Sequence, residues 1–300
     1  QGNYYHEYSD NRHDANIANQ YVWASGAAIK DKLFFFAMLG NQPSNDSTST
    51  TQTFHTYSDN RNKNALLNLT WNITGDQSLN VVGYRSWTDK FNNQYSLTRD
   101  YDSRSQGKYF GWTSSHVKDQ FLIGNYNWQI NDAMSLRLMA GYLSESSLKP
   151  TSTSGTGLPY VTEVDPVTQV TRNIGITTQS NQLFPFDYWR RGYKGDFTWN
   201  LGDHKITLGG EHYKHYINNV VATTEGGDWT YHDEPGTILA NGSPAPADGR
   251  YVDQFFESTG GAFYTVNKAA YLDDYWQVAD RWIVYGGLRY DVFINKNVNG

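Results

Sequence analysis

Apolar and polar side chains alternate with a period of two through the last hairpin of the chain, residues 267–294. From Trp282 onward the even positions form one face, and the odd positions, which include Arg289 and Asp291, form the other. The even-numbered face consists of Trp282, Val284, Gly286, Leu288, Tyr290, Val292 and Ile294. A period of two over this length predicts a β-strand and not a helix. A strand that is apolar on one face, charged on the other and about 9–11 residues or longer is typical of an outer-membrane barrel.

The same unit recurs along the chain as two strands joined by a short turn. The predicted hairpins are residues 20–41, 64–91, 116–145, 190–217 and 267–294. Long polar segments separate them, at residues 43–63, 90–115, 147–188 and 218–266. Outer-membrane barrels have short periplasmic turns and longer extracellular loops. We therefore expect an all-β fold of about ten antiparallel transmembrane strands, with residues 1–19 as an external segment that follows an earlier strand.

Tryptophan marks the turn end of the first strand in four of the five predicted hairpins. Trp71, Trp128, Trp199 and Trp276 each lie two residues before a terminal aliphatic residue, and Trp282 opens the last strand. An indole ring favours the membrane interface, where its ring is apolar and its N–H stays hydrated. These five residues are the predicted aromatic girdle on the periplasmic side. The alternative is a row of core tryptophans in a soluble sandwich, which the polar residues on the opposite faces disfavour.

Composition fits this interpretation. Only 38% of residues are hydrophobic, yet aromatic residues make up 16%, which is uncommon in disordered chains. Half-polar barrel strands and long hydrated loops produce this combination. The formal net charge of -6 argues against a nucleic-acid partner, and the absence of cysteine excludes disulfides and thiolate metal sites.

The segment AAYLDDYWQVADRWIVYGGLRYD, residues 269–291, resembles a strand pair of TonB-dependent outer-membrane receptors. An acidic residue before a Trp, a short turn and a Gly-x-Arg-Tyr-Asp strand carry the resemblance. Together with residues 256–268 it is similar to the Oar-like branch, whose N-terminal extension is carboxypeptidase-regulatory-like. The resemblance implies a barrel of about 22 strands, a plug domain and a box that contacts the TonB energy-coupling system. This chain contains neither plug nor box, so we expect all 300 residues to be an internal part of one barrel domain; a closed ten-strand barrel is the alternative.

Two groups of residues suggest metal chemistry. Glu211, Tyr213 and His215 share one predicted face, and residues 228–234 form an acidic cluster without an ordered calcium-ligand spacing. Solvated polar groups are the more common explanation for both, so we expect no metal and no cofactor. Because G-x-S-x-G, H-E-x-x-H and a cysteine nucleophile are all missing, we expect no catalytic residue, although a barrel hydrolase could assemble a site across strands.

The long loops carry aromatic and hydrogen-bonding side chains that suit a ligand surface. The predicted ligand-binding residues are Tyr160, Trp189, Trp229, Tyr231, Tyr251 and Phe255. Rigid scaffolds commonly present binding residues on such loops. The sequence thus predicts a barrel in the bacterial outer membrane, surrounded by lipid, that takes up a small nutrient. By the resemblance, the TonB energy-coupling system acts through a plug that this chain does not contain. A non-transporting barrel for adhesion or secretion is the alternative function.

Overall fold

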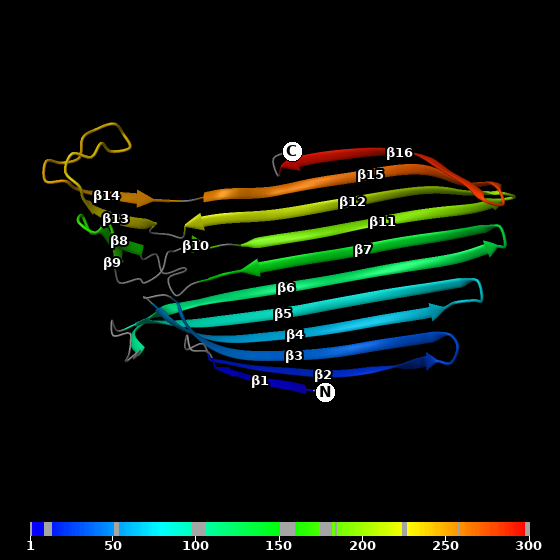
Figure 1. The fold of residues 1–300 in the computed structure, drawn as a ribbon, viewed down its shortest axis with the longest axis horizontal. Helices are drawn as coiled ribbons and strands as arrows, with labels where there is room; N and C mark the ends of the chain where they lie inside the picture. The colour runs from blue at the N-terminus through cyan, green and yellow to red at the C-terminus, as the bar shows by residue number, and fades with distance from the viewer. Residues whose placement is uncertain are drawn as a thin grey trace.

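The main element of the fold is one large antiparallel sheet (Figure 1). The computed structural model describes residues 2–8, 14–50, 54–97, 106–150, 160–174, 182–183, 185–223, 227–256 and 258–297. The sheet runs in the order β1-β2-β3-β4-β5-β6-β7-β11-β12-β15-β16, and β10 pairs with β12. Its strands are β1 Gly2–Tyr8, β2 Asp14–Ile29, β3 Leu33–Thr50, β4 Phe54–Asn72, β5 Gln77–Leu97, β6 Gln106–Asn131, β7 Met134–Leu148, β10 Gln182–Leu183, β11 Phe186–Leu201, β12 His204–Thr223, β15 Ser258–Ala279 and β16 Trp282–Asn297.

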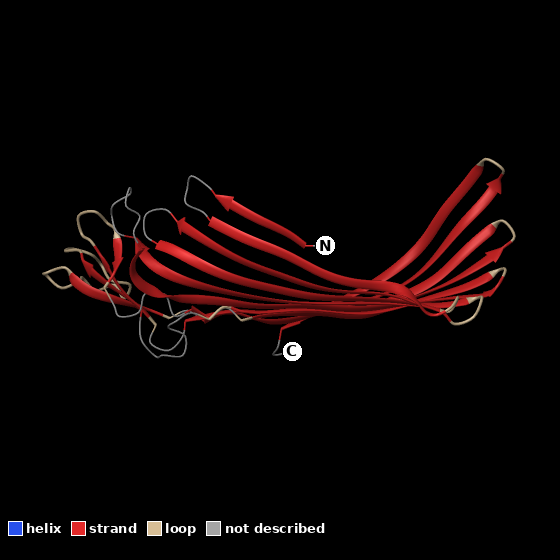
Figure 2. Cartoon of the chain, turned by 90° about the horizontal axis from the view of Figure 1, so that it is seen from below, coloured by secondary structure: helices blue, strands red, loops and turns tan. Residues whose placement is uncertain are grey.

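The predicted all-β fold and its ten long strands are confirmed. These strands are β2 to β7, β11, β12, β15 and β16, and each predicted hairpin corresponds to one consecutive pair. In Figure 2 the sheet curves into an open trough with β1 and β16 at its two edges, so the barrel wall is not closed. Nowhere in the described part of the chain does a helix have the length and apolar character needed to cross a membrane.

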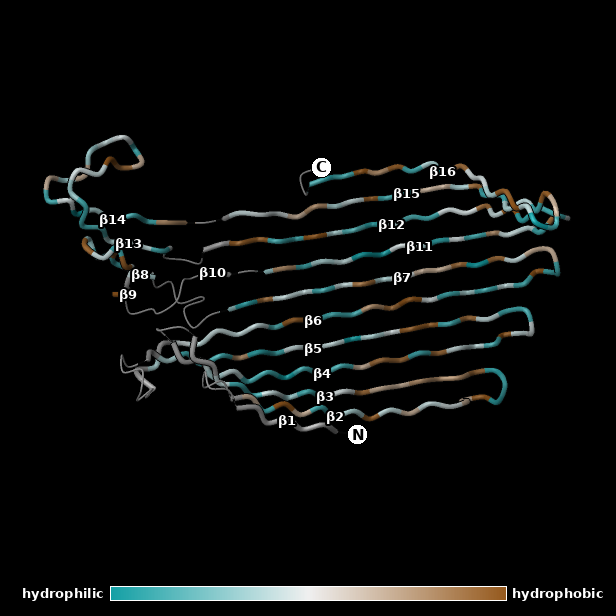
Figure 3. Tube along the Cα trace, viewed as in Figure 1, coloured by the Kyte–Doolittle hydropathy of each residue, from teal (hydrophilic) through white to brown (hydrophobic). Residues whose placement is uncertain are grey.

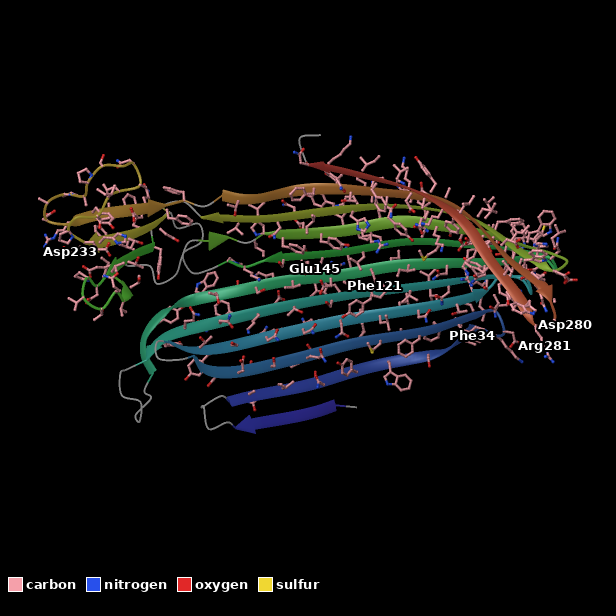
Figure 4. All side chains as sticks on the ribbon, turned by 45° about the horizontal axis from the view of Figure 1, so that its top comes forward. Phe34, Phe121, Glu145, Asp233, Asp280 and Arg281 are labelled. Atoms are coloured by element: carbon pink, nitrogen blue, oxygen red, sulfur yellow. The ribbon has the colours of Figure 1, made fainter. Side chains whose placement is uncertain are left out.

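Short turns gather at one end of the sheet, which we call the turn end, and the longer connections gather at the other, the loop end (Figure 4). Asp280 and Arg281 mark the turn end, and Asp233 marks the loop end. Asp31, in the first short turn, adopts a left-handed backbone with φ 60°, a conformation that Asp tolerates better than most residues. Because short turns of outer-membrane barrels face the periplasm, the loop end is extracellular.

The predicted long loops are shorter than expected, because the strands continue into them. β3 and β4 stay paired as far as Thr50 and Phe54, so most of the segment 43–63 is strand. Likewise β5 and β6 extend into residues 90–115, and the segment 1–19 contains β1 and the start of β2. Outside the bilayer both faces of a ladder meet water, so alternation weakens while backbone pairing persists. Pro43 is compatible with its place in β3 because the β2–β3 pairing is interrupted opposite it, and proline has no N–H to donate to a neighbouring strand.

The strand register gives the sheet two chemically different faces, a difference also visible as alternating colours along the strands in Figure 3. The outer, convex face carries exposed apolar residues such as Leu67, Leu122, Leu208 and Leu288. The inner, concave face lines a pocket of about 1400 Å³ with polar side chains, among them Asn127, Lys194, Thr198, Asn200, Thr207 and Asp273. Few apolar residues are buried among the described ones, since the apolar surface faces outward, as lipid contact requires.

A second, smaller sheet lies at the loop end of the large one (Figure 1). We call it the loop sheet; its order is β14-β13-β8-β9. The strands are β8 Tyr160–Val164, β9 Thr171–Asn173, β13 Asp228–Asp233 and β14 Arg250–Phe255. β8 and β13 are parallel, and the other two pairs are antiparallel. The predicted loops 147–188 and 218–266 therefore meet in one folded unit, which sequence periodicity does not reveal.

Candidate ligand-binding surface on the loop sheet

Five of the six predicted ligand-binding residues lie in the loop sheet, but not on one face. The register places Trp229 and Tyr231 on one face of β13. Tyr160, Tyr251 and Phe255 belong to the opposite face, because they are paired with Asp228, His232 and Asp228 respectively. Tyr231 and Phe255 are 47% and 52% exposed, which leaves an accessible ring on each face. The loop sheet is therefore a two-sided aromatic surface.

A histidine at the centre of the second face organises its polar groups. The His232 ring stacks on Tyr251 with centroids 4.6 Å apart and planes 6° apart. Its Nε2 lies 3.1 Å from Oδ2 of Asp253, and its Nδ1 lies 4.0 Å from Oε1 of Glu234. The Tyr251 hydroxyl donates to Oε2 of Glu234 over 3.3 Å. This side of the sheet thus presents two carboxylates beside a stacked ring pair, which favours ligands that donate hydrogen bonds.

The Tyr251 hydroxyl stays protonated well into alkaline conditions. Desolvation raises the pKa of Tyr251 above its ordinary value, and the neighbouring Glu234 carboxylate raises it further. Both causes disfavour a phenolate, because an apolar surrounding and a nearby negative charge each oppose a second negative charge. The phenol therefore remains a hydrogen-bond donor on this face.

Local backbone signals explain the connections of the loop sheet. Asp165 follows β8 and accepts hydrogen bonds from the backbone N–H groups of Val167 and Thr168, at 3.0 and 2.9 Å. An Asp followed by Pro166 is a common start of such a turn. Between β13 and β14, the N–H of Glu234 donates to the carbonyl of Gly249 over 2.9 Å. This bond closes residues 234–249 into a compact loop whose two ends are neighbours.

Trp189, the sixth predicted residue, lies in the barrel wall instead. It belongs to β11, where it stacks on Tyr216 with ring centroids 5.6 Å apart. The prediction that it lies in a loop with the other five is wrong, because β11 begins at Phe186, four residues before the predicted strand start at residue 190.

The two groups of residues that suggested metal chemistry lie in different elements, one on β12 and one in the loop sheet. Glu211 forms an ion pair with Arg289, while His215 lies four positions farther up β12. In the acidic segment 228–234, Asp228 and His232 lie on one face of the sheet and Asp233 on the other. Within the residues that the structure describes, no group of three His, Asp or Glu side chains converges in a way that could hold a metal ion.

The predicted girdle tryptophans occupy the turn ends of their strands. Trp71 pairs with Leu33 and Leu79, Trp199 with Met134 and Ile206, and Trp276 with His204 and Val284. Trp128 and Trp282 lie similarly, opposite Leu136 and Ala279. Trp282 is 73% exposed and Trp71 is 44% exposed, so the rings are not core residues. Their role at the membrane interface stays a prediction that this placement supports.

A charged cluster on the inner face was not expected from the sequence. Arg289 contacts Asp291 through Nε and Nη2, at 2.9–3.1 Å, and also forms the ion pair with Glu211. Arg289 also lies over the ring of Tyr271, with its Cζ 5.4 Å from the ring centroid. Period-two parity could have placed each residue on the inner face. Only the register between three strands brings them together.

Tyr271 extends that cluster toward β11. Its hydroxyl donates to Asp196 Oδ1, and Lys194 Nζ lies 3.6 Å from the other carboxylate oxygen of Asp196. The ring lies across Gly209, where a Cβ would overlap it. Glycine at this position lets an aromatic ring from the next strand cover the backbone, a known device in β-barrels. The inner wall is therefore a connected polar surface spanning β11, β12, β15 and β16.

Comparison with known proteins identifies the fold family. A family model described as "Outer membrane beta barrel domain" matches residues 39–299. The chain belongs to this outer-membrane barrel family. The predicted location in the bacterial outer membrane is thereby confirmed, as is the lipid environment that such a barrel requires. No curated protein sequence is significantly similar to the chain.

Solved outer-membrane transporters share the fold. The outer membrane transporter YddB from Escherichia coli is 13% identical with a TM-score of 0.51, covering 94% of this chain and 34% of its own. The ferric citrate transporter FecA in its unliganded form is 15% identical with a TM-score of 0.50, covering 99% of this chain and 38% of its own. The chain spans little more than a third of the length of these structures. At such identities the likeness shows the fold alone.

Proposed function

We propose that this chain is part of an outer-membrane barrel that takes up a small ligand, and that the loop sheet captures this ligand at the extracellular end. The observation that carries the proposal is the loop sheet itself. It brings five aromatic residues and the His232 cluster from segments 160–174 and 227–256 together above the barrel wall. The likeness of the fold to that of outer-membrane transporters supports uptake as the activity.

The chemistry of the loop sheet favours a ligand with aromatic or sugar-like faces and hydrogen-bond donors. Exposed rings such as Tyr231 and Phe255 offer flat apolar contact. Glu234 and Asp253 accept hydrogen bonds and repel anionic groups. A neutral or cationic ligand is therefore the class that fits this surface.

The resemblance of residues 269–291 to TonB-dependent receptors supports energised transport. In this proposal a plug supplied by a longer chain closes the barrel, and the polar inner wall with Lys194, Asp196 and Arg289 contacts that plug. The finer assignment to the Oar-like branch stays a prediction from the sequence. The second candidate function, a non-transporting adhesion or secretion barrel, keeps the exposed loop sheet but needs neither plug nor energy coupling.

The proposal is tested by depletion of small molecules from a defined medium by cells that express the natural full-length protein. Two double variants separate the faces, Trp229→Ala with Tyr231→Ala, and Tyr251→Ala with Phe255→Ala. Trp189→Ala in the barrel wall is the matched aromatic control. We expect at least one compound to be depleted, at least one double variant to lose that depletion by about tenfold, and the control to retain it.

Two results would contradict the proposal in different ways. If no compound is depleted more than by cells that lack the protein, the chain does not serve uptake and the adhesion or secretion function is favoured. If depletion occurs and both double variants retain it, transport stands but the loop sheet is not the capture surface. Loss of depletion after removal of the energy-coupling protein distinguishes active from passive passage.

A further inference from the structure

Aromatic rings and cations gather on the outer face of the sheet near its loop end. Trp189 stacks on Tyr216, with centroids 5.6 Å and planes 21° apart, and meets Tyr264 edge-on at 6.4 Å. The Arg191 guanidinium carbon lies 5.1 Å from the centroid of the Trp189 ring. Lys214 Nζ lies 4.5 Å from the centroid of the Tyr264 ring. We call these five residues the outer cation–aromatic cluster.

The register shows that this cluster faces outward. Arg191 and Lys214 are cross-strand partners, and Arg191 has the same parity on β11 as the outward residues Tyr193 and Phe197. The adjacent Arg190 has the opposite parity, and its guanidinium lies over the ring of Tyr213 on the inner face, 4.5 Å from the ring centroid. The side chains of two neighbouring arginines therefore lie on opposite faces of the sheet.

The cluster lies at the height of the second membrane interface. Trp199 and Trp189 are separated by ten residues of β11, or about 33 Å of strand at roughly 3.3 Å per residue. At a tilt of about 35–45° this corresponds to about 23–27 Å along the membrane normal, which matches an apolar band of about 25 Å. The outward side chains between Arg191 and Trp199 are Tyr193, Gly195 and Phe197, all without charge. With Trp199 at the periplasmic interface, the cluster meets the headgroups of the outer leaflet.

Neither cation of the cluster, Arg191 or Lys214, forms an ion pair with another side chain that the structure describes. The carboxylate nearest in register on this face is Asp187, which lies beyond Trp189 toward the loop end. A similar group repeats on β5 and β6, where Arg85 lies 4.6 Å from the Trp87 ring centroid and Lys118 is the partner of Trp87. Cations at a lipid boundary attract anionic headgroups.

We propose that the outer cation–aromatic cluster binds the phosphate-bearing headgroup of an outer-leaflet lipid. The Arg191 guanidinium and the Lys214 ammonium pair with phosphate oxygens, since a planar guanidinium can donate two parallel hydrogen bonds to a phosphate. The rings of Trp189, Tyr216 and Tyr264 pack against the sugar or glycerol part of the headgroup, at the level where aromatic side chains accumulate. The stacking holds both cations in position before the lipid arrives.

The test compares lipid retention by the full-length protein in lipid-bilayer discs. The discs contain lipid A, a phosphorylated glucosamine disaccharide lipid, or the same lipid with its phosphates removed. Retained lipid is counted by native mass spectrometry. We expect at least about tenfold stronger retention of the phosphorylated lipid, and loss of this preference in Arg191→Gln with Lys214→Gln. Arg190→Gln, next in sequence and on the inner face, should keep the preference.

Three outcomes would overturn the proposal. Equal retention of both lipids by the unaltered protein rules out phosphate recognition without reference to any variant. Equal loss in Arg190→Gln and in the double variant points to a general effect of charge on assembly, which heat-dependent gel mobility of the barrel checks independently. Displacement of the lipid by millimolar inorganic phosphate indicates a free-phosphate site and not a headgroup site.

Discussion

On the outer face near the turn end, Nδ1 of His204 lies 2.7 Å from Oδ2 of Asp274. Asp274 shares its face with Leu272 and Trp276, which is an unfavourable place for a carboxylate. In the structure His204 is the partner of this carboxylate. The His204 ring also stacks on Trp276, with centroids 5.2 Å apart and planes 10° apart. The imidazole thus covers a charge that would otherwise face the membrane interface.

We expect His204→Ala to destabilise the barrel by about 1 kcal/mol, because it leaves the Asp274 carboxylate without its partner near lipid. The measurement is the urea midpoint of the folded barrel, followed by heat-dependent gel mobility. His204→Ala combined with Asp274→Asn is the control and should recover most of the loss, since the carboxylate charge is then removed. Equal destabilisation in single and double variants would show that stacking on Trp276, and not the contact with Asp274, stabilises the barrel.

Gly209→Ala should destabilise the wall by about 1–3 kcal/mol, because the new Cβ overlaps the Tyr271 ring. Displacing this ring also breaks the hydrogen bond from its hydroxyl to Asp196. The neighbouring Gly210→Ala is the matched control, since its Cβ would meet the carbonyl of Ala269 at 3.4 Å, an ordinary contact distance. The measurement is the urea midpoint of unfolding, compared between the two variants. Similar urea midpoints would mean that the position of the Tyr271 ring does not require a glycine at residue 209.

Placing a charge on the outer face should be far more costly than placing it on the inner face. Phe197→Arg puts a cation between Leu136 and Leu208 on the outer face, at an expected cost of about 2–4 kcal/mol. Thr198→Arg places the same charge in the polar inner pocket and should be tolerated. The amount of folded barrel recovered from the outer membrane is the readout. If both variants assemble equally, the assignment of the two faces is wrong.

Orientation can be measured with an impermeant thiol reagent on intact cells. Because short turns face the periplasm, cysteine at Asp31, Asp76, Asp132, Asp203 or Asp280 should stay unlabelled. Cysteine at Ser243, an exposed residue of the loop that joins β13 and β14, should react. Of the other two external positions expected from the sequence, Ser154 lies outside the described residues and Ser49 belongs to β3. Labelling of the short turns with protection of Ser243 would reverse the topology and place the outer cation–aromatic cluster in the inner leaflet.

The sequence by itself determined the membrane-spanning part of each strand. Alternation from Trp282 to Ile294 is a local property, since successive side chains of a strand point to opposite faces whatever the neighbouring strands do. Where one face meets lipid and the other meets water, apolar and polar residues therefore alternate along the strand. The five hairpins, the turn-end tryptophans and the outer-membrane barrel could all be predicted for this reason.

Tertiary structure alone decided everything that depends on pairing between strands. The ladder from Pro43 to Thr50 continues in water, where both faces are polar and no period survives. His204 meets Asp274, and Arg289 meets Glu211, only through the register of β12, β15 and β16. β8 joins β13 across more than sixty residues of chain. Such contacts depend on backbone hydrogen bonds that any residue except proline can make, so residue type along the chain does not specify their partners.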